Sequence, residues 1–151
     1  MSFSAIGLVD PKTRWNCGGA LRAAYCYNAS LIVVSGNRVK RREMWNPALT
    51  DTVATHKHIP ILMAEKDSLK NFLPKGCVPI AVDLIEGATS LPKYEHPERA
   101  MYFFGAEDGT LGKNVTDWCR DIVYIPTETC MNLAATVNVV LYDRMAKNVS
   151  R

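Results

Sequence analysis

Short runs of apolar residues alternate along this chain with segments in which apolar residues recur at the spacing of a helix. The runs are apolar at nearly every position, which is typical of strands buried on both faces of a parallel sheet. Strands are predicted at residues 30–34, 59–63, 78–82, 100–104 and 122–125, with a weaker candidate at residues 5–9. Helices are predicted at residues 18–27, 49–55, 65–72, 113–119 and 133–147. This alternation predicts an α/β fold, a three-layer sandwich around a parallel sheet, and the lack of repeats or linkers favours a single domain over residues 1–151.

The last predicted helix is apolar around more than one face. Its apolar stripe consists of Ala134, Val137, Val140, Leu141 and Met145, and it is widened by Ala135 and Val139. Arg144 and Lys147 suit the C-terminus of a helix, where positive charge is favourable. A helix this apolar lies either in the core or at a subunit interface. We expect the interface, and therefore a homodimer.

Composition narrows the class of protein further. The chain has 151 residues, of which 48% are apolar and 22% charged, so a disordered or low-complexity protein is excluded. A net charge of +3 is compatible with nucleic acid but does not require it. No apolar run approaches the ~18 residues of a membrane span, and the first residues do not read as a secretory signal. Five cysteines without a CxxC pair predict a reducing, cytoplasmic location, with neither a disulfide framework nor a metal site.

Three polar or glycine-bearing segments follow predicted strands, where the ligands of parallel sheets gather. In the first, residues 15–22, Asn16 is a candidate N-cap and the pair Gly18 and Gly19 lets another group approach the backbone closely. Arg22 lies about one turn into the helix, where a guanidinium can bind a phosphate with two hydrogen bonds. Taken alone, this segment is more typical of a capped helix with a surface arginine.

The second segment, residues 103–112, runs from an apolar strand into a loop with three glycines and the adjacent acids Glu107 and Asp108. Its glycine spacing matches neither the dinucleotide fingerprint nor a phosphate-binding P-loop, and the alternating oxygen ligands of a calcium loop are missing. The loop is typical either of a polar turn or of a backbone cradle for a neutral or cationic ligand, because its acids repel phosphate.

In the third segment, residues 125–135, a strand ends at Pro126 and Asn132 stands at the start of the final helix. Asn132 is predicted to be the N-cap of that helix. Cys130 has no histidine near it in the sequence, so we interpret it as a packing residue and not as a nucleophile.

Together and in this order, the three segments resemble the signature motifs of the SpoU (TrmH-like) branch of the SPOUT RNA methyltransferases. The family's first motif has an Asn, a Gly and an Arg at the spacing of Asn16, Gly18 or Gly19, and Arg22. Its second motif, Phe-Gly-x-Glu followed by Gly and Leu, is matched by Phe104, Gly105, Glu107, Gly109 and Leu111. Its third motif, Ile-Pro and then Ser-Leu/Met-Asn-Leu/Val before an apolar helix, is matched by Ile125, Pro126, Met131, Asn132 and Leu133. The resemblance spans about residues 5–147.

The resemblance implies a C-terminal trefoil knot, which is a rare exception to the rule that protein chains do not thread loops. It also implies an obligate homodimer and methyl transfer from S-adenosylmethionine to a ribose 2′-hydroxyl of tRNA or rRNA. By their positions in the motifs, the implied active-site residues are Asn16, Arg22, Glu107 and Asn132. The residues implied to bind the cofactor are Val82, Asp83, Leu84, Gly105, Ala106, Glu107, Gly109, Leu111, Ile125, Pro126, Cys130, Met131, Leu133 and Ala134.

The sequence departs from the family's third motif at two positions. Cys130 stands where the family has a serine, and Ala134 stands where a small polar residue often follows Asn-Leu. A thiol is a weaker hydrogen-bond donor than a hydroxyl, so any bond from position 130 to cofactor or substrate is expected to be weakened.

A ribose hydroxyl is a poor nucleophile, so positioning and assistance to proton loss are expected to supply most of the catalysis. We expect Arg22 to hold the phosphate of the target nucleotide and to help accept the hydroxyl proton. Asn16 and Glu107 are expected to fix Arg22 and the acidic loop, and Asn132 to orient the substrate. Attraction of RNA is expected from a basic cluster, with Trp45 available for stacking, although such a cluster is as typical of a solvated loop. The cluster consists of Arg38, Lys40, Arg41 and Arg42.

The sequence does not identify the RNA. Since no further RNA-binding domain is visible, a small target such as a tRNA loop, with the anticodon wobble position as an example, is favoured over a site in rRNA. One alternative is a knotted RNA-binding dimer without catalysis, although the four active-site residues argue against it. Another is a flavodoxin-like nucleotide binder, which fits the strand pattern, but the chain lacks a glycine motif that cradles phosphate.

Overall fold

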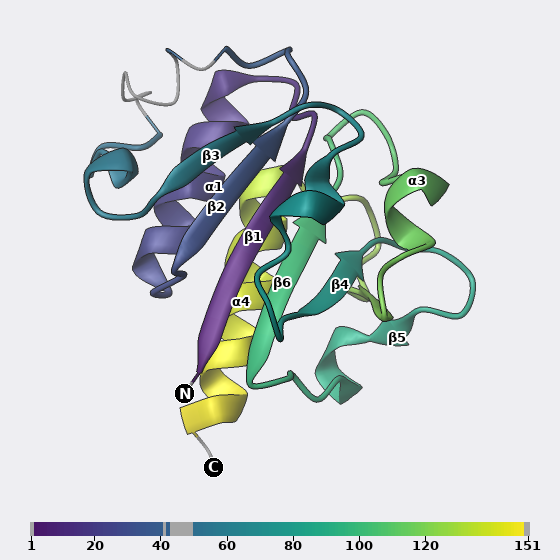
Figure 1. Ribbon diagram of the computed structural model, residues 1–151. Coiled ribbons are helices and arrows are strands. Elements are labelled where there is room, and N and C mark those ends of the chain that lie inside the picture. Colours follow the sequence, from purple (N-terminus) through teal and green to yellow (C-terminus); the bar gives the residue numbers. More distant parts are fainter. Residues whose placement is uncertain (1, 41, 43–49, 150–151) are drawn as a thin grey trace.

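The computed structural model describes residues 2–40, 42 and 50–149, and within these ranges seven strands and three helices have defined bounds (Figure 1). The strands are β1 (Phe3–Val9), β2 (Leu31–Ser35), β3 (Ile61–Ala64), β4 (Val78–Val82), β5 (Thr89–Ser90), β6 (Arg99–Phe104) and β7 (Asp121–Tyr124). The helices are α1 (Arg14–Cys26), α3 (Lys113–Thr116) and α4 (Leu133–Val149). Short 3-10 helices are η1 (Thr55–Lys57), η2 (Leu69–Phe72) and η3 (Leu91–Lys93).

All strand pairs in the sheet are parallel, and the strand order is β3-β2-β1-β6-β4-β7-β5. The central strand β6 pairs with β1 and β4, and its residues 100–104 are buried almost completely. One face of the sheet packs against α1 and α4, and the other packs against α3 and η2 (Figure 1). The prediction of a parallel-sheet α/β fold is therefore confirmed.

The predicted strands agree with the observed ones to within one or two residues, but two predicted helices are wrong. Within the described part of 49–55, the chain forms turns, because the Asp51 carboxylate accepts hydrogen bonds from the backbone N–H (3.1 Å) and hydroxyl (2.7 Å) of Thr55. A short polar side chain that binds the backbone in this way competes with helix formation. Of the predicted helix at 65–72, only the 3-10 helix η2 forms. The helix predicted at 113–119 ends at Thr116.

Helices α1 and α4 approach each other closely where small residues face one another. A Cβ atom added to Gly19 would lie 2.8 Å from the Cβ of Ala134, which is closer than two such atoms approach in practice. Glycine at position 19 therefore allows α1 to pack directly against the first turn of α4. This contact brings the first sequence motif next to the third.

The apolar stripe of α4 divides between the core and the surface. Val137, Val140 and Leu141 are buried, as the pattern predicts. Val139, Tyr142 and Met145 are 37%, 56% and 42% exposed, so a second apolar face of the helix lies open in the single chain. Met145 therefore belongs to the outer face and not to the buried one. No helix within the described ranges is both long enough and apolar enough to span a membrane.

A buried polar cluster fixes α4 near the amino ends of the strands. The His96 ring lies between the Tyr102 hydroxyl (2.6 Å from Nδ1) and the Asp143 carboxylate (2.8 Å from Nε2). Asp143 is also paired with Lys147 at 2.7 Å. Burial lowers the pKa of His96 below its ordinary value of 6.5, although the bond to Asp143 opposes this shift. His96 is therefore held in its neutral form.

The neutral state of His96 predicts that the protein loses stability in mild acid. Between the lowered folded pKa and 6.5, the unfolded chain binds more protons than the folded one, so the free energy of unfolding falls as the pH falls. The slope is expected to approach, at most, about 1.4 kcal/mol per pH unit. Urea unfolding of the parent, His96→Gln and the exposed-site control His58→Gln between pH 7.5 and 5.5 measures it. His96→Gln is expected to flatten the dependence and His58→Gln to keep it; an unchanged slope in His96→Gln would contradict the assignment.

Candidate functional site

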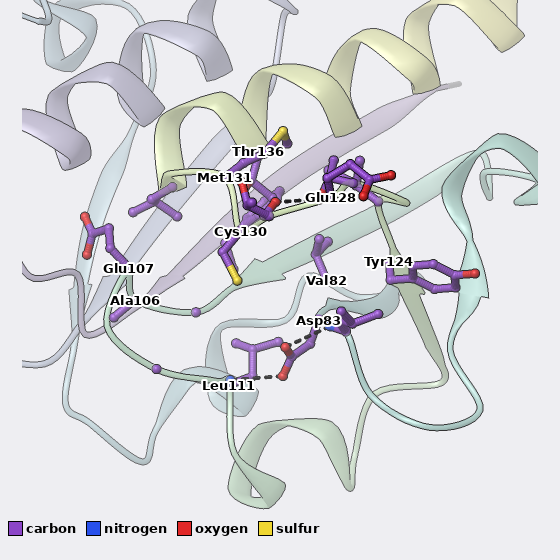
Figure 2. A pocket seen from close by; sticks show the side chains of 18 residues that line it. Val82, Asp83, Ala106, Glu107, Leu111, Tyr124, Glu128, Cys130, Met131 and Thr136 are labelled. Carbon is purple, nitrogen blue, oxygen red and sulfur yellow. Dashed lines mark hydrogen bonds between the residues drawn. The ribbon is translucent and has the colours of Figure 1, made fainter.

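A cavity of about 270 Å³ opens at the carboxyl ends of β4, β6 and β7 (Figure 2). Its volume is just below the range of about 300–1,000 Å³ that is usual for small-molecule sites. Every residue predicted to bind the cofactor lines this cavity except Pro126 and Ala134. Six other residues line the cavity that the motifs do not predict as cofactor-binding, which are Phe104, Tyr124, Thr127, Glu128, Thr129 and Thr136. Most of them are neighbours of motif residues in the sequence. Thr136 lies one helical turn after Asn132 and reaches the cavity from α4.

Asp83 links two walls of the cavity, the end of β4 and the loop of residues 105–112. One carboxylate oxygen accepts a hydrogen bond from the backbone N–H of Leu84 (2.9 Å), and the other accepts one from Leu111 (3.2 Å) (Figure 2). The loop of residues 105–112 therefore folds back onto the end of β4. Gly105 permits this fold, because a Cβ there would lie 3.2 Å from the backbone nitrogen of Leu111. The shape of this wall depends on one aspartate and one glycine.

The third sequence motif forms another wall of the cavity, and this wall includes the N-cap of α4. The side-chain oxygen of Asn132 accepts a hydrogen bond from the N–H of Ala135 (2.8 Å), and its backbone carbonyl accepts one from Thr136 (3.0 Å). The prediction that Asn132 caps the final helix is confirmed. Its carboxamide is thereby fixed beside Met131 and Leu133, which line the cavity.

The cavity is acidic. Asp83, Glu107 and Glu128 line it, and none of the described lining residues is a lysine, arginine or histidine. Such a site favours a cationic or neutral ligand over a phosphate. Across residues 2–40, 42 and 50–149, no group of three or more His, Cys, Asp or Glu side chains is arranged to hold a metal ion.

Glu107 connects the cavity to the loop after β1. Its Oε2 atom accepts a hydrogen bond from the backbone N–H of Lys12 at 3.2 Å. Its Oε1 atom is buried and has no hydrogen-bond partner among the described residues. A buried carboxylate oxygen without a donor is costly, so this atom is an acceptor available to a ligand or a water molecule.

Helix α1 begins earlier than its sequence predicts, so Asn16 is not its N-cap. Thr13 takes that position in an extended conformation, and its hydroxyl oxygen accepts a hydrogen bond from the N–H of Asn16 at 3.3 Å. Asn16 therefore lies in the first turn of the helix. Arg22 lies more than two turns along the helix instead of one, because the helix begins at Arg14.

Arg22 is exposed and donates a hydrogen bond to the Thr52 hydroxyl at 2.8 Å. In the part of the chain that the structure describes, no hydrogen bond or ion pair joins Arg22 to Glu107. Asn16 and Arg22 do not line the cavity, whereas Glu107 does. The structure thus brings the second and third motifs together around one cavity and places the first motif outside it, on the helix beside α4.

The predicted basic cluster is only partly described. Lys40 and Arg42 are exposed, whereas Arg41 and Trp45 lie outside the described residues. The Arg38 guanidinium is paired with the carboxylates of Asp108 (2.9 Å) and Asp10 (3.3 Å). Its bond to Asp108 holds the pKa of that carboxyl below its usual range. Arg38 is thus engaged with the cavity's own loop.

The sequence model of the SpoU rRNA Methylase family matches residues 4–142. None of the curated proteins matches this sequence.

Solved structures of methyltransferases share the fold. The SpoU methyltransferase AviRb from Streptomyces viridochromogenes has a TM-score of 0.82 and 15% identity, and the match covers 98% of this chain and 60% of that one. An AdoMet-bound rRNA methyltransferase from Sinorhizobium meliloti has a TM-score of 0.82 and 18% identity, over 97% of this chain and 57% of that one. This chain thus spans less than two thirds of the length of either protein. A protein described in work on 2-OH methylation of C/U34 on tRNA has a TM-score of 0.81 and 19% identity, over 99% of both chains.

Proposed function

This chain belongs to the SpoU rRNA methylase family, and we propose that it binds S-adenosylmethionine in the cavity described above and methylates a ribose 2′-hydroxyl of RNA. The observation that carries the proposal is the convergence of the second and third motifs on one acidic cavity. The two motifs are separated in the sequence, and they form neighbouring walls only because β6 and β7 both flank β4.

The lining residues fit this cofactor. When bound, S-adenosylmethionine supplies a methyl group on a positively charged sulfur. Glu107 and Glu128 line the cavity, and their carboxylates suit a ligand that carries positive charge. Val82, Leu111 and Leu133 provide apolar surface suited to a flat aromatic ring.

The chain's own residues then act on the RNA. Arg22 binds the phosphate of the target nucleotide with its forked guanidinium and thereby positions the ribose hydroxyl. Glu107 offers its unpaired Oε1 atom, which is an acceptor for a hydrogen bond from ligand or substrate. Asn132 fixes the start of α4 through its cap and orients the substrate beside the cavity. Cys130, exposed at the cavity, replaces the family's serine and supplies a weaker donor there.

The substrate in this proposal is tRNA, with the anticodon wobble position as the specific candidate. The likeness that extends over 99% of both chains is to a protein studied for 2-OH methylation of C/U34 on tRNA, which favours tRNA over rRNA. The activity belongs in a reducing cytoplasm, a placement that five cysteines without a CxxC pair support.

The active form in this proposal is a knotted homodimer. The strand order supports a knot, because β7 lies between β4 and β5 although these two strands follow one another in the chain. The connection of residues 83–88 therefore has to pass β7, and the chain that leaves β7 toward α4 has to pass that connection. The exposed apolar residues Val139, Tyr142 and Met145 support a dimer formed through α4.

Calorimetry and methyl transfer test the proposal together. The protein is expected to bind S-adenosylmethionine at one site per chain, and to transfer labelled methyl groups to bulk tRNA at 2′-oxygens, which mapping of 2′-O-methyl marks identifies. Binding of the cofactor without transfer to any RNA would favour the alternative of a catalytically silent RNA-binding dimer. No heat of binding would exclude both the cofactor and the reaction.

A further inference from the structure

A polar cluster joins the loops that follow β1, β2 and β6, directly beside the cavity. Its members are Asp10 after β1, Gly36 and Arg38 after β2, and Glu107 and Asp108 after β6. These three strands lie side by side in the sheet in the order β2-β1-β6. The cluster therefore fastens three neighbouring strand ends on the edge of the sheet where the cavity opens.

Arg38 lies at the centre of the cluster. Its Nη1 atom donates to one carboxylate oxygen of Asp108 at 2.9 Å, and Nη2 donates to the other at 3.3 Å. Its Nε atom is paired with the Asp10 carboxylate at 3.3 Å, and Nη2 also donates to the Asp10 backbone carbonyl. All three nitrogen atoms of one guanidinium are thus used by two loops. A lysine ammonium, which is a single point of charge, does not match this forked geometry.

The backbone at this point is arranged around the same contacts. Asp10 adopts a left-handed conformation with φ of 47°, and its N–H donates to the Ser35 carbonyl at 3.0 Å. Gly36 has φ of 89°, and a Cβ there would lie 2.0 Å from an oxygen of the Asp10 carboxylate. Left-handed residues outside glycine cost energy and persist where the surroundings enforce them, most often at functional sites. Glycine after β2 leaves the room that the Asp10 carboxylate needs to reach Arg38.

The cluster controls the residue that faces the cavity. Asp108, held by Arg38, directly follows Glu107, which lines the cavity and accepts a hydrogen bond from Lys12 in the same loop as Asp10. Release of Asp108 would loosen the middle of the 105–112 loop, whose other anchors are the bond between Asp83 and Leu111 and the bond between Lys12 and Glu107. The position of Glu107 therefore depends on contacts that Arg38 makes.

We propose that Arg38 is a positioning residue, which holds the 105–112 loop and Glu107 in the geometry that the cofactor and substrate require, and is not a phosphate contact for RNA. The identity of the ligand, S-adenosylmethionine, rests on the proposed function. The contacts of Arg38 with the two loops are observed in the structure and do not depend on that function. It assigns to Arg38 a different role from Lys40 and Arg42 of the same basic cluster.

The test compares Arg38→Ala with the matched control Arg42→Ala in the full chain. Arg38→Ala is expected to raise the Kd for S-adenosylmethionine about tenfold and to lower kcat, because a small displacement of site residues reduces the rate strongly. The dependence of RNA affinity on salt separates the two roles. Loss of a phosphate contact reduces the slope of log K against log salt by about 1, whereas loss of a positioning residue leaves the slope unchanged. Arg42→Ala is expected to leave the Kd for S-adenosylmethionine unchanged and to reduce the salt slope by about 1.

Two further variants sharpen the comparison. Asp108→Asn is expected to reproduce the cofactor defect of Arg38→Ala in direction, and the double variant is expected to be no worse than Arg38→Ala alone, because Asp108 acts through its contact with Arg38. Arg38→Lys keeps the charge and loses the fork, so it is expected not to restore cofactor affinity. Rescue by lysine would indicate a simple charge effect and overturn the proposal.

Hydrogen exchange of the backbone amides in residues 105–112 gives a readout that does not need the cofactor. These amides are expected to exchange faster in Arg38→Ala and Asp108→Asn than in the parent. In Arg42→Ala, their exchange rates are expected to equal those of the parent. Unchanged exchange together with a reduced salt slope in Arg38→Ala would overturn the proposal. If the parent binds no S-adenosylmethionine, the proposed function fails, and the exchange of residues 105–112 still decides the role of Arg38.

Discussion

Replacement of Arg22 with alanine is expected to lower kcat for methyl transfer to RNA by at least about 100-fold, with the affinity for S-adenosylmethionine unchanged. Arg22 is exposed on α1 and does not line the cavity, so its loss leaves the cofactor's surroundings intact. It donates a hydrogen bond to the Thr52 hydroxyl, a contact that RNA phosphate would replace with a stronger, charge-assisted one. An arginine side chain stays charged in proteins, so its contribution is to clamp and orient rather than to remove the proton alone.

Initial rates with labelled cofactor and tRNA, combined with calorimetry for cofactor binding, measure this effect. Arg22→Lys is expected to fall between the parent and the alanine variant, because it keeps the charge but loses the two-point contact. Thr52→Ala removes the partner of Arg22 without changing charge, and it is expected to keep kcat within about twofold. A wild-type rate in Arg22→Ala would remove Arg22 from the mechanism, whereas a lost affinity for cofactor would show that the helix α1 shapes the cavity.

The strands were predictable from the sequence because their burial on both faces leaves an unbroken apolar signal. Residues 78–82 and 100–104 show this most clearly, and they form β4 and most of β6. Strand β5 consists of only Thr89 and Ser90, is not apolar, and was missed. The order of the strands depends on contacts far apart in the chain, so periodicity alone does not place β7 between β4 and β5.

Local capping signals gave mixed results for a physical reason. Asn132 was predicted as a cap correctly, since its side-chain oxygen accepts a hydrogen bond from the N–H of Ala135. Asn16 was predicted wrongly, because Thr13 lies upstream and satisfies the same free N–H groups first. Both residue types cap well, so the sequence does not decide between them without the backbone geometry.

Charged residues were the hardest to interpret, because a sequence does not reveal their partners. Arg38 was predicted to contact RNA, yet it is paired with acids from two other loops. Arg144 was predicted to lie at a helix C-terminus as a favourable charge, yet it is 5% exposed. The resemblance in motifs located the cavity well, since most of its predicted residues line it, but it gave no information about these two arginines.

Replacement of Arg144 with alanine is expected to lower the free energy of unfolding by about 3–4 kcal/mol, a large part of the roughly 5–15 kcal/mol typical of a domain. The guanidinium donates to the carbonyl oxygens of Pro97 (2.6 Å), Glu98 (2.8 Å) and Phe3 (3.3 Å), and to the Tyr102 hydroxyl (3.2 Å). These acceptors come from the start of β1, the segment before β6 and β6 itself, so one side chain ties α4 to the central strands. Without it, these partly buried acceptors lose a charged donor.

Urea unfolding of Arg144→Ala, Arg144→Met and the surface control Arg120→Ala separates hydrogen bonding from packing. Methionine keeps most of the apolar stem but donates no hydrogen bond, so Arg144→Met is expected to lose nearly as much stability as alanine. Arg120 is paired with Asp121 on the surface, and its loss is expected to cost no more than about 1 kcal/mol. Parent-like stability in Arg144→Met would show that water replaces the guanidinium as donor to these carbonyls and that the arginine contributes packing alone. The predicted loss would instead mean that α4, whose first turn forms a wall of the cavity, is held in place from its opposite end.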